Sequence, residues 1–445
     1  MLKFKVSNLG RVRSASVQLA PLTILVGKND TGKSYLATLI WALNNLNLLL
    51  SNKEARSRRP KWIRDFFSLD GFDTDREIII DAEKGAELIK YLNDLFRRQG
   101  AEFLAKVFAF DGFDRTSVSV ETTEFEPFTM RFSRVREVSS DGDEREDMYV
   151  RVGGADDHLS FGLQFERRFF EETNVFQDLL FQQLLSIVVN GYVRPFGGVS
   201  YIPAARTGLM LTYNSIASDR FAPTGAQNLD LPMPLTAFLQ KLSATQSQFK
   251  DSKSKLAKWL QETIMSGDIV LGEGKTRKSL AFRPSGSELE LPLHATSSMI
   301  TELAPYLIEM KSYIRGKHFI LEEPEAHLHL EAQREMARAI SRLIAAGAQV
   351  TLTTHSDTFL QQINNLMSLS DHPKRRALMK EFGYKREDII SPDMAEAYEF
   401  NSIEGATDVQ KIKKTPEGFV VPSLNRTLLS LARETLAIRE KQRND

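Results

Sequence analysis

The chain has 445 residues, of which 42% are hydrophobic and 26% charged, and its formal net charge is zero. Its length is enough for two or three domains or for one domain with large insertions, and the zero net charge excludes a global attraction to nucleic acid or membranes. Cysteine is absent, which excludes disulfides, thiolate metal sites and cysteine nucleophiles. A signal-peptide core and a membrane-spanning run are not recognised, so we expect a cytoplasmic protein without membrane contact.

The N-terminal residues 1–26 predict two or three short strands, the last of them the apolar run Leu22–Leu25. A loop of the form G-x-x-x-x-G-K-S follows, and then a helix that we expect to run from Ser34 to about Leu50. An ordinary glycine-containing turn is the alternative, but a strand before the loop and a helix after it favour phosphate binding. The predicted nucleotide-binding residues are Gly27, Lys28, Asn29, Asp30, Thr31, Gly32, Lys33 and Ser34.

Each part of this loop has a physical reason. The two glycines allow backbone angles and close approaches that a Cβ would prevent, so successive N–H groups and the positive end of the helix can cradle phosphate oxygens. Lys33 is expected to contact the β- and γ-phosphates, and the Ser34 hydroxyl is expected to ligate Mg²⁺.

The middle of the chain is less informative. The basic segment Lys53–Arg64 carries interleaved aromatic residues and predicts either a nucleic-acid contact or, as the preferred interpretation, a solvated loop or helix face. Residues 76–170 look strand-rich, with an acidic hairpin tip or loop at 139–147, and residues 165–190 and 233–265 look helical. Arg206 ends a predicted strand, where it could meet a phosphate or form a structural salt bridge.

Two further strands end in chemically active residues. The apolar run Lys317–Leu321 is followed by Glu322 and Glu323, which is typical of a Walker B site. Glu322 would hold the Mg²⁺ shell, and Glu323 would orient or deprotonate the attacking water. His355 follows the buried run Gln349–Thr354, and its ring is expected to contact the γ-phosphate or the attacking water.

A third candidate lies between these motifs. Ser297 and Ser298 precede a predicted helix and could present donors and a positive helix end to phosphate, although a plain helix cap explains them equally well. Pro305 is expected to end the first turns of that helix or to kink it.

In this order the motifs resemble the ABC-type ATPase heads of the SMC and RecF group, and most of all the branch of the overcoming-lysogenization-defect (OLD) proteins. Residues 27–34 are similar to that branch's G-x-N-x-x-G-K-S, residues 321–329 to its L-E-E-P-E-x-x-L-H, and residues 354–356 to its T-H-S switch. Met299 follows Ser298 where the usual signature loop has glycines, and Glu322 stands where ABC transporters have Asp.

The resemblance implies an α/β fold: an ABC-ATPase head with a mixed central sheet and helices, a mixed α/β insertion between the P-loop and the signature region, and no long coiled coil. Its core would comprise residues 1–50 and 290–445, and the insertion residues 51–289, of which 195–210 would return to the core. It also implies ATP and Mg²⁺ as cofactors and a head-to-tail dimer, or a higher homo-oligomer, with ATP held between the P-loop of one copy and Ser297–Ser298 of the other.

The expected function is an ATP-hydrolysing switch that controls a separately encoded effector, a nuclease, in bacterial anti-phage defence, because ATPase subunits of the Septu and PARIS systems resemble this plan. No Asp-x-Asp pair follows His355, so we expect no nuclease site in this chain. The alternative is a RecF- or SMC-like repair or recombination ATPase that clamps DNA. A last amphipathic helix, capped by Ser423 and bearing Leu424, Leu428, Leu431 and Leu436, is expected to complete the core, with a partner contact as the alternative.

Overall fold

The largest unit of the computed structural model is a nine-stranded sheet in the order β5-β1-β2-β16-β15-β3-β14-β13-β9. The structure describes residues 2–66, 76–121, 125–138, 144–154, 161–166, 173–190, 198–212, 230–248, 254–272, 279–312, 314–421 and 429–439. The strands of this sheet are β1 (Lys3–Leu9), β2 (Val12–Gln18), β3 (Leu22–Gly27), β5 (Ser117–Glu121), β9 (Val199–Ile202), β13 (His318–Glu322), β14 (Gln349–Thr354), β15 (Ala395–Ile403) and β16 (Ala406–Lys411).

The sheet is mixed. Strands β15, β3, β14, β13 and β9 pair in parallel, whereas β1 pairs antiparallel with β2 and β5, and β15 pairs antiparallel with β16. The predicted α/β class with a mixed central sheet is therefore confirmed, as are the strands expected before residue 27. Among the described residues the longest helix is α5, with 27 residues, and no long coiled coil is present there.

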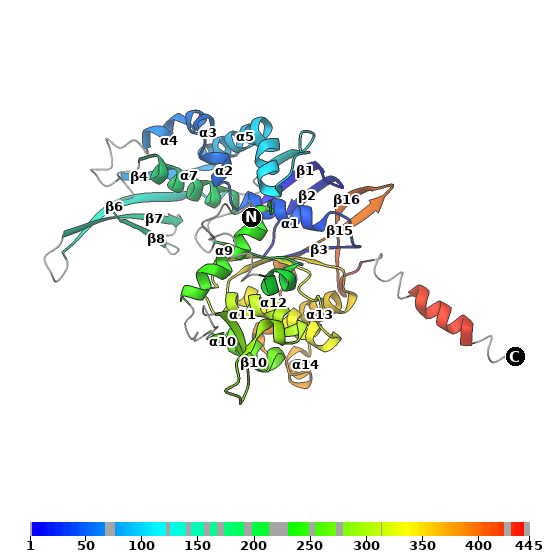
Figure 1. Ribbon diagram of the computed structural model, residues 1–445. Coiled ribbons are helices and arrows are strands. Elements are labelled where there is room, and N and C mark those ends of the chain that lie inside the picture. The colour runs from blue at the N-terminus through cyan, green and yellow to red at the C-terminus, as the bar shows by residue number, and fades with distance from the viewer. Residues whose placement is uncertain are drawn as a thin grey trace.

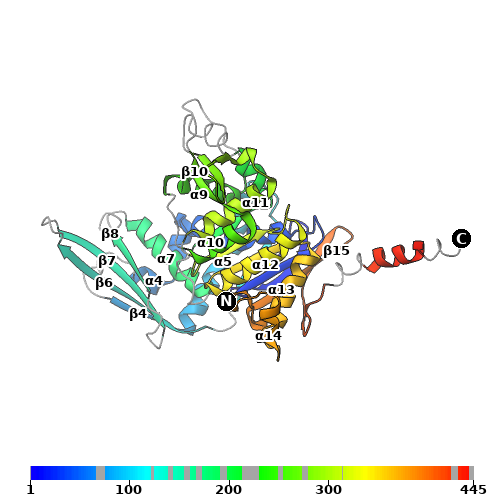
Figure 2. The same ribbon diagram turned by 90° about the horizontal axis from the view of Figure 1, so that it is seen from below.

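Helices cover both faces of the sheet (Figures 1 and 2). They are α1 (Lys33–Leu43), α2 (Asn47–Leu50), α3 (Lys53–Arg58), α4 (Lys61–Phe66), α5 (Ala82–Phe108), α7 (Thr173–Asn190), α9 (Met233–Gln248), α10 (Lys255–Leu260), α11 (Ser298–Met310), α12 (Leu330–Ala345), α13 (Asp357–Ser368) and α14 (Arg375–Glu381). Side chains alternate along a strand, so β3 places Leu25 in the cluster with α1 and Ile24 in the cluster with α12 and α13. The parallel strands are buried from both sides for this reason.

The first helix is shorter than expected. Helix α1 ends at Leu43 instead of continuing to Leu50, and α2 follows as a separate turn. The amide side chains of Asn44 and Asn45 donate to the carbonyls of Ile40 and Trp41, at 2.7 Å and 2.8 Å. Asparagine side chains compete in this way for carbonyls that the helix ladder would otherwise use, which explains the break.

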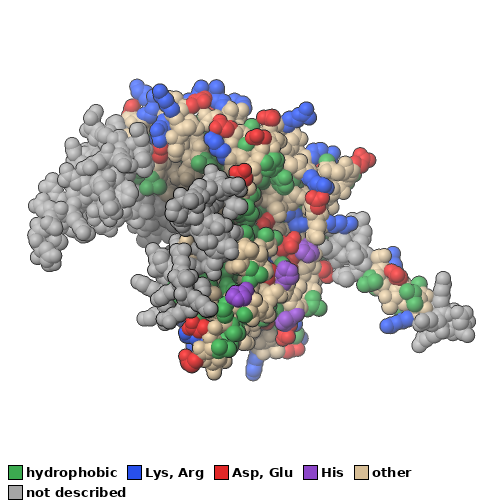
Figure 3. All heavy atoms as spheres, viewed as in Figure 1, with side chains coloured by type: hydrophobic (Ala, Val, Ile, Leu, Met, Phe, Trp, Pro, Cys, Tyr) green, Lys and Arg blue, Asp and Glu red, His purple; other side chains and the backbone are tan. Residues whose placement is uncertain are grey.

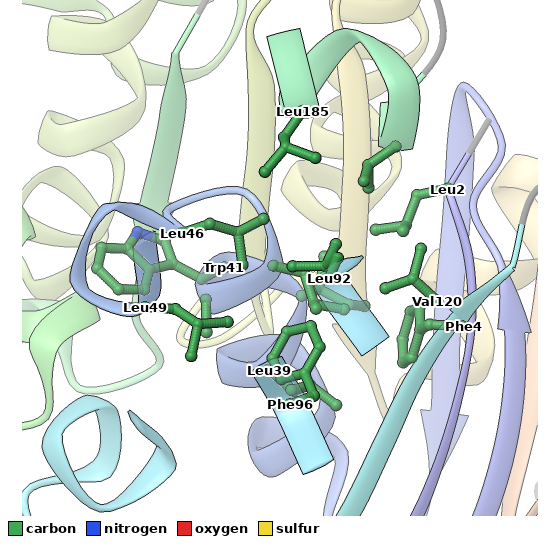
Figure 4. Close-up of a cluster of buried hydrophobic side chains, with 14 of the residues drawn as sticks. Leu2, Phe4, Leu39, Trp41, Leu46, Leu49, Leu92, Phe96, Val120 and Leu185 are labelled. Atoms are coloured by element: carbon green, nitrogen blue, oxygen red, sulfur yellow. The ribbon is translucent and has the colours of Figure 1, made fainter. Parts of the chain in front are cut away.

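Helix α5 is absent from the sequence-based description, which expects strands over residues 76–170. Asp81 caps it by accepting from the Lys84 N–H at 2.9 Å. Its buried side chains include Leu88, Leu92 and Phe96, which recur at the spacing of one helix face, so the pattern was present in the sequence. Figure 4 shows Leu92 and Phe96 close to side chains of β1, α1 and α2, where α5 helps to enclose the core.

Smaller sheets accompany the large one. Strands β4 (Arg76–Ile80), β6 (Phe128–Val138), β7 (Glu144–Gly154) and β8 (Phe161–Glu166) form an antiparallel sheet, β10 (Gly267–Gly272), β11 (Ser279–Pro284) and β12 (Leu291–Pro292) form another, and β17 (Lys414–Thr415) pairs with β18 (Gly418–Phe419). Of the predicted acidic tip, 139–143 lie outside the described residues and 144–147 belong to β7. The division into core and insertion stays a prediction. Strand β9 lies in the large sheet and belongs to the range 195–210 that is expected to return to the core, and β5, from the rest of the predicted insertion, lies in the same sheet.

A buried ion-pair cluster stabilises the outer side of α12. The Asp388 carboxylate is fully buried and accepts from Arg338 Nη2 at 2.9 Å and from Arg342 Nε at 2.6 Å. Burial alone would raise the pKa of Asp388, but these hydrogen bonds outweigh it and hold the pKa below its ordinary value. We expect Asp388→Asn to lower the free energy of unfolding by about 3 kcal/mol, because Arg342 loses the carboxylate with which it pairs and Arg338 keeps only Glu335. Urea unfolding at pH 7 measures this loss.

The fluorescence of Trp259, whose ring lies 4.1 Å from the Arg342 guanidinium carbon, reports the transition. Because its folded-state pKa is depressed, the stability that Asp388 contributes is present above its unfolded pKa of about 4 and is lost as the pH falls through the folded value. The exposed neighbour Glu387 supplies the control Glu387→Gln, and an equal effect of the two variants would contradict the assignment.

The expectation that the last helix completes the core is wrong for its described part. Residues 429–439 form a helix in which all side chains are exposed, including Leu431 and Leu436 at 60% and 59%. Figure 1 shows this helix apart from the body of the molecule. Ser423, Leu424 and Leu428 lie outside the described residues. In the described part of the chain the helices are too short or too polar to cross a membrane.

Candidate nucleotide-binding and hydrolysis site

The glycine-rich loop joins a fully buried strand to a helix. Strand β3 ends at Gly27 and α1 begins at Lys33. A Cβ on Gly27 would lie 2.9 Å from the Phe400 Cβ, and one on Gly32, whose φ is +91°, would lie 2.7 Å from a Val12 methyl group. Both positions therefore require glycine, the first because of a close approach and the second also because of its left-handed backbone. The loop has the shape that the sequence predicts for phosphate binding.

The Lys33 side chain is bent back over the loop. Its Nζ donates to the carbonyls of Gly27 at 2.8 Å and Lys28 at 2.6 Å. Burial lowers the pKa of Lys33, and the charges of Glu323, Glu325 and Glu322 oppose that shift. The electrostatic effect shows that Lys33 lies close to the three glutamates of the Walker B segment.

The sheet register brings the separate motifs to one edge. Strand β14 lies between β3 and β13, and all three are parallel. Thr354, the last residue of β14, lies beside Val26, and Thr353 lies beside Glu322. Because parallel strands end at the same edge, the glycine-rich loop, His355 and Glu322–Glu323 all follow the carboxyl ends of adjacent strands, where α/β sheets bind ligands.

Glu322 and Glu323 differ in their surroundings. Glu322 is buried, and its Oε2 accepts from the Ala204 N–H at 3.1 Å, whereas its Oε1 meets no hydrogen-bond partner among the residues that the structure describes. Glu323 is partly exposed and has a φ of +44°, a left-handed conformation that is strained for a glutamate. Its N–H donates to the carbonyl and to the hydroxyl of Thr353, both at 3.1 Å, so β14 holds this backbone in place.

His355 lies directly beside Glu323. The distance from His355 Nδ1 to Glu323 Oε1 is 3.3 Å, and the ring is about half exposed. The Glu325 carboxylate is buried, and its Oε1 accepts from the Thr354 hydroxyl at 2.6 Å and from the His355 N–H at 3.2 Å. Burial raises the pKa of Glu325, although these hydrogen bonds oppose the rise. Sequence reasoning did not single out Glu325, even though it is the last acid of the E-E-P-E run.

Arg206 is also part of this arrangement, as a buried structural residue. Its guanidinium is 0% exposed and donates to the carbonyls of Glu322 and Glu323. Of the two roles left open by the sequence, the salt bridge is the one that the structure shows, because Arg206 Nε lies 2.5 Å from Glu302 Oε2.

Ser297 and Ser298 come from a different helix, α11. Both are exposed at the start of α11, Ser297 is the N-cap residue without a side-chain capping bond, and the helix does not end at Pro305 but continues to Met310. Within the described residues, neither serine makes a hydrogen bond or ion pair with the glycine-rich loop. Ile300 and Thr301 donate their N–H groups to the Ser297 carbonyl at 3.0 Å and 3.3 Å, whereas within the described residues the N–H groups of Ser298 and Met299 make no hydrogen bond.

The basic segment Lys53–Arg64 forms α3 and α4. Arg56 and Arg59 both pair with Asp178, and Arg58 pairs with Glu54, so all three arginines are ion-paired within the chain and the two acids balance two of their three charges. Figure 3 shows basic side chains over the upper part of the molecule with acidic side chains among them. The preferred interpretation, a solvated helix face, agrees with this distribution better than a nucleic-acid groove does.

The residues present fit a magnesium ion held together with phosphate. Mg²⁺ in phosphate sites takes one or two protein ligands and completes its shell with phosphate and water, and the unpartnered Glu322 Oε1 and the exposed Ser34 hydroxyl provide such ligands. Among the described residues there is no group of three or more His, Cys, Asp or Glu that could hold a metal by itself.

The fold and this edge are those of a P-loop nucleotide-binding protein. The chain belongs to the AAA ATPase domain family, whose sequence pattern matches residues 1–124 and 212–360, more than half of its length. It is accordingly an ATPase that binds ATP. No match to a curated protein was found.

Several solved SMC head domains are similar to this chain. One, bound to the C-winged helix domain of ScpA, has a TM-score of 0.36 and 12% identity and covers 92% of this chain and 97% of its own. The SMC head of Thermotoga maritima has a TM-score of 0.30 and 11% identity, and the match covers 93% of this chain and 99% of the other. A third structure is the Pyrococcus furiosus SMC head with an extended coiled coil, bound to the C-terminal domain of ScpA. It has a TM-score of 0.34 and 12% identity, and the match covers 97% of this chain and 98% of the other.

Proposed function

We propose that this chain is an ATP-driven switch subunit that dimerises head to tail around ATP and controls a separately encoded effector nuclease in bacterial anti-phage defence. The dimer is supported by two phosphate-binding features that make no hydrogen bond with each other within the described residues. Lys33, Glu323 and His355 lie at one sheet edge, whereas Ser297–Ser298 begin a helix whose donors are not used there. A second copy can bring the two together around one nucleotide.

The residues have distinct roles in this proposal. Lys33 exchanges its bonds to the loop carbonyls for the β- and γ-phosphates, and the loop N–H groups hold the remaining oxygens. The Glu323 carboxylate accepts the proton of the attacking water, and His355, 3.3 Å away, holds that water or the γ-phosphate. Bound Mg²⁺ supplies positive charge that stabilises the transferring phosphoryl group. Glu322 and Ser34 are the residues that would hold it.

The role in defence rests on the motif resemblance to OLD-like proteins and to the ATPase subunits of Septu and PARIS systems. The effector follows from the same resemblance, as does a switch in which ATP binding closes the dimer and hydrolysis reopens it. Purification of the tagged chain with and without ATP, together with the products of neighbouring reading frames, tests this part. A nuclease that binds in only one nucleotide state supports it, and a nuclease-free complex in both states refutes it.

Mixing two inactive variants tests the head-to-tail arrangement. The first variant is Lys33→Ala, which removes the phosphate-binding cation, and the second is Ser297→Arg/Ser298→Arg, which blocks the start of α11. Each alone is expected to hydrolyse almost no ATP. In a mixed dimer one site carries both lesions and the other carries none, so mixing should restore up to about half of the activity that one wild-type site provides.

Each variant mixed with wild-type chain supplies the control, and mass photometry reports whether dimers form with ATP. If both lesions act within one chain, every site in the mixture carries a lesion and no activity returns. That result would refute the shared site while leaving the ATPase assignment intact.

A further inference from the structure

The Arg206 side chain connects the loop after β9 to the Walker B segment. Its Nη1 donates to the Glu322 carbonyl at 2.8 Å and to the Pro203 carbonyl at 3.1 Å, and its Nη2 donates to the Glu323 carbonyl at 2.9 Å. Arginine presents its donors in a rigid planar fork, so these bonds fix the carbonyls relative to each other. The side chain is fully buried, and water does not compete for the bonds.

The Glu302 carboxylate joins three segments of the chain. It is 1% exposed and lies in the second turn of α11. Its Oε2 faces Arg206 Nε at 2.5 Å, while its Oε1 accepts from the Thr207 hydroxyl and contacts His327 Nδ1 at 2.8 Å. One side chain on α11 therefore contacts the helical segment 206–212 that follows β9 and, through His327, the loop after Glu325.

The residues held by this cluster have strained backbones. Glu323 and His327 are non-glycine residues with φ values of +44° and +56°. The Glu323 peptide is fixed on both sides, by Thr353 at its N–H and by Arg206 at its carbonyl. A strained conformation persists only where its surroundings impose it, and such positions concentrate where a side chain must be aimed.

We propose that Arg206 is a positioning residue for ATP hydrolysis: it aims the Glu323 carboxylate and, through Glu302, makes that aim depend on the position of α11. The proposal rests on the proposed function, in which nucleotide from the second copy binds at Ser297–Ser298. These serines and Glu302 lie within the first two turns of the same helix. Nucleotide bound at the start of α11 would then act on the Glu323 of the same copy, which serves the other ATP site.

Arg206→Lys tests the positioning role. Lysine keeps the buried charge but cannot hold both carbonyls and Glu302 at once, so we expect kcat to fall by about 10² while the Kd for ATP changes by less than about threefold. Steady-state hydrolysis and ATP titration of the full chain measure the two values. Arg342→Lys is the matched control, because Arg342 also pairs with a buried carboxylate, and it should alter thermal stability more than kcat.

A double-mutant cycle separates positioning from general damage. If Arg206 acts through Glu323, then Arg206→Lys should lower single-turnover hydrolysis by less than about threefold when Glu323→Gln is already present. An equal loss in both backgrounds would overturn the inference.

His327→Ala provides a second variant that leaves the buried pair intact, since the His327 side chain is 61% exposed. We expect it to lower kcat severalfold with an unchanged Tm, whereas His372→Ala, at another exposed histidine, should leave both unchanged.

Different results would refute the positioning role of Arg206 and the proposed ATP switch. Wild-type kcat in both Arg206→Lys and His327→Ala would refute the positioning role and leave the ATP switch standing. The positioning role would also be refuted, and the switch would stand, if mixing the two variants restores hydrolysis while the effects of Arg206→Lys and Glu323→Gln on the rate are additive. A wild-type chain that hydrolyses no ATP would refute both.

Discussion

Glu323→Gln should bind ATP with nearly wild-type affinity and hydrolyse it about 10²–10⁴ times more slowly. A positioned general base contributes rate enhancements of this size, and glutamine keeps the shape of the side chain while losing its basicity. Because the Glu323 carboxylate is partly exposed, and its ion pair within the described part of the chain is the one with the half-exposed His355, the fold should tolerate the change. Single-turnover hydrolysis measures the loss, and light scattering should show dimers that persist with ATP.

The control for this variant is Glu331→Gln, which removes an exposed carboxylate from the first turn of α12. Its turnover should equal that of the wild type. Undiminished hydrolysis by Glu323→Gln would show that another group takes the proton, and the neighbouring His355 would then be the first residue to test.

Lys33→Ala should lose ATP affinity by about one to two orders of magnitude and hydrolysis by more. Hydrogen bonds to charged groups contribute about 1.5–3 kcal/mol each, and Lys33 is the loop cation with its ammonium buried at the edge of the sheet. The three nearby glutamates add to the effect, because without Lys33 their charge repels the phosphates. Equilibrium titration with a fluorescent ATP analogue measures the change.

Lys106→Ala removes an exposed lysine that pairs with Glu102 on α5, and it should leave ATP affinity unchanged. Full-strength ATP binding by Lys33→Ala would mean that the glycine-rich loop does not hold the triphosphate. Urea unfolding of the same variant shows whether any loss of binding reflects a loss of fold.

The strands that carry the candidate site could be predicted from sequence because each is apolar and ends in a polar motif. The order of these strands in the sheet could not be predicted. Nothing in the run Gln349–Thr354 says that it lies between β3 and β13, since buried parallel strands present similar apolar surfaces to every partner. The meeting of Lys33, Glu323 and His355 is thus a property of the register of the sheet.

Other residues were ambiguous for local reasons. Arg206 could have contacted a phosphate or a carboxylate, and only the position of Glu302 on α11 decides between them. Helix α5 was not predicted although its apolar residues have helical spacing. The exposed leucines after residue 428 show that an amphipathic pattern predicts a helix but not the surface against which it packs.

The strand that carries the glycine-rich loop is flanked only by β14 and β15, both from residues 349–403. During synthesis β3 therefore lacks its strand neighbours until residues 349–403 have been made, and Gly27 packs against Phe400 only after that. Pairing between such distant segments is slow to form. We therefore expect the nucleotide-binding edge of the sheet to form late in folding, after β14 and β15 have paired with β3.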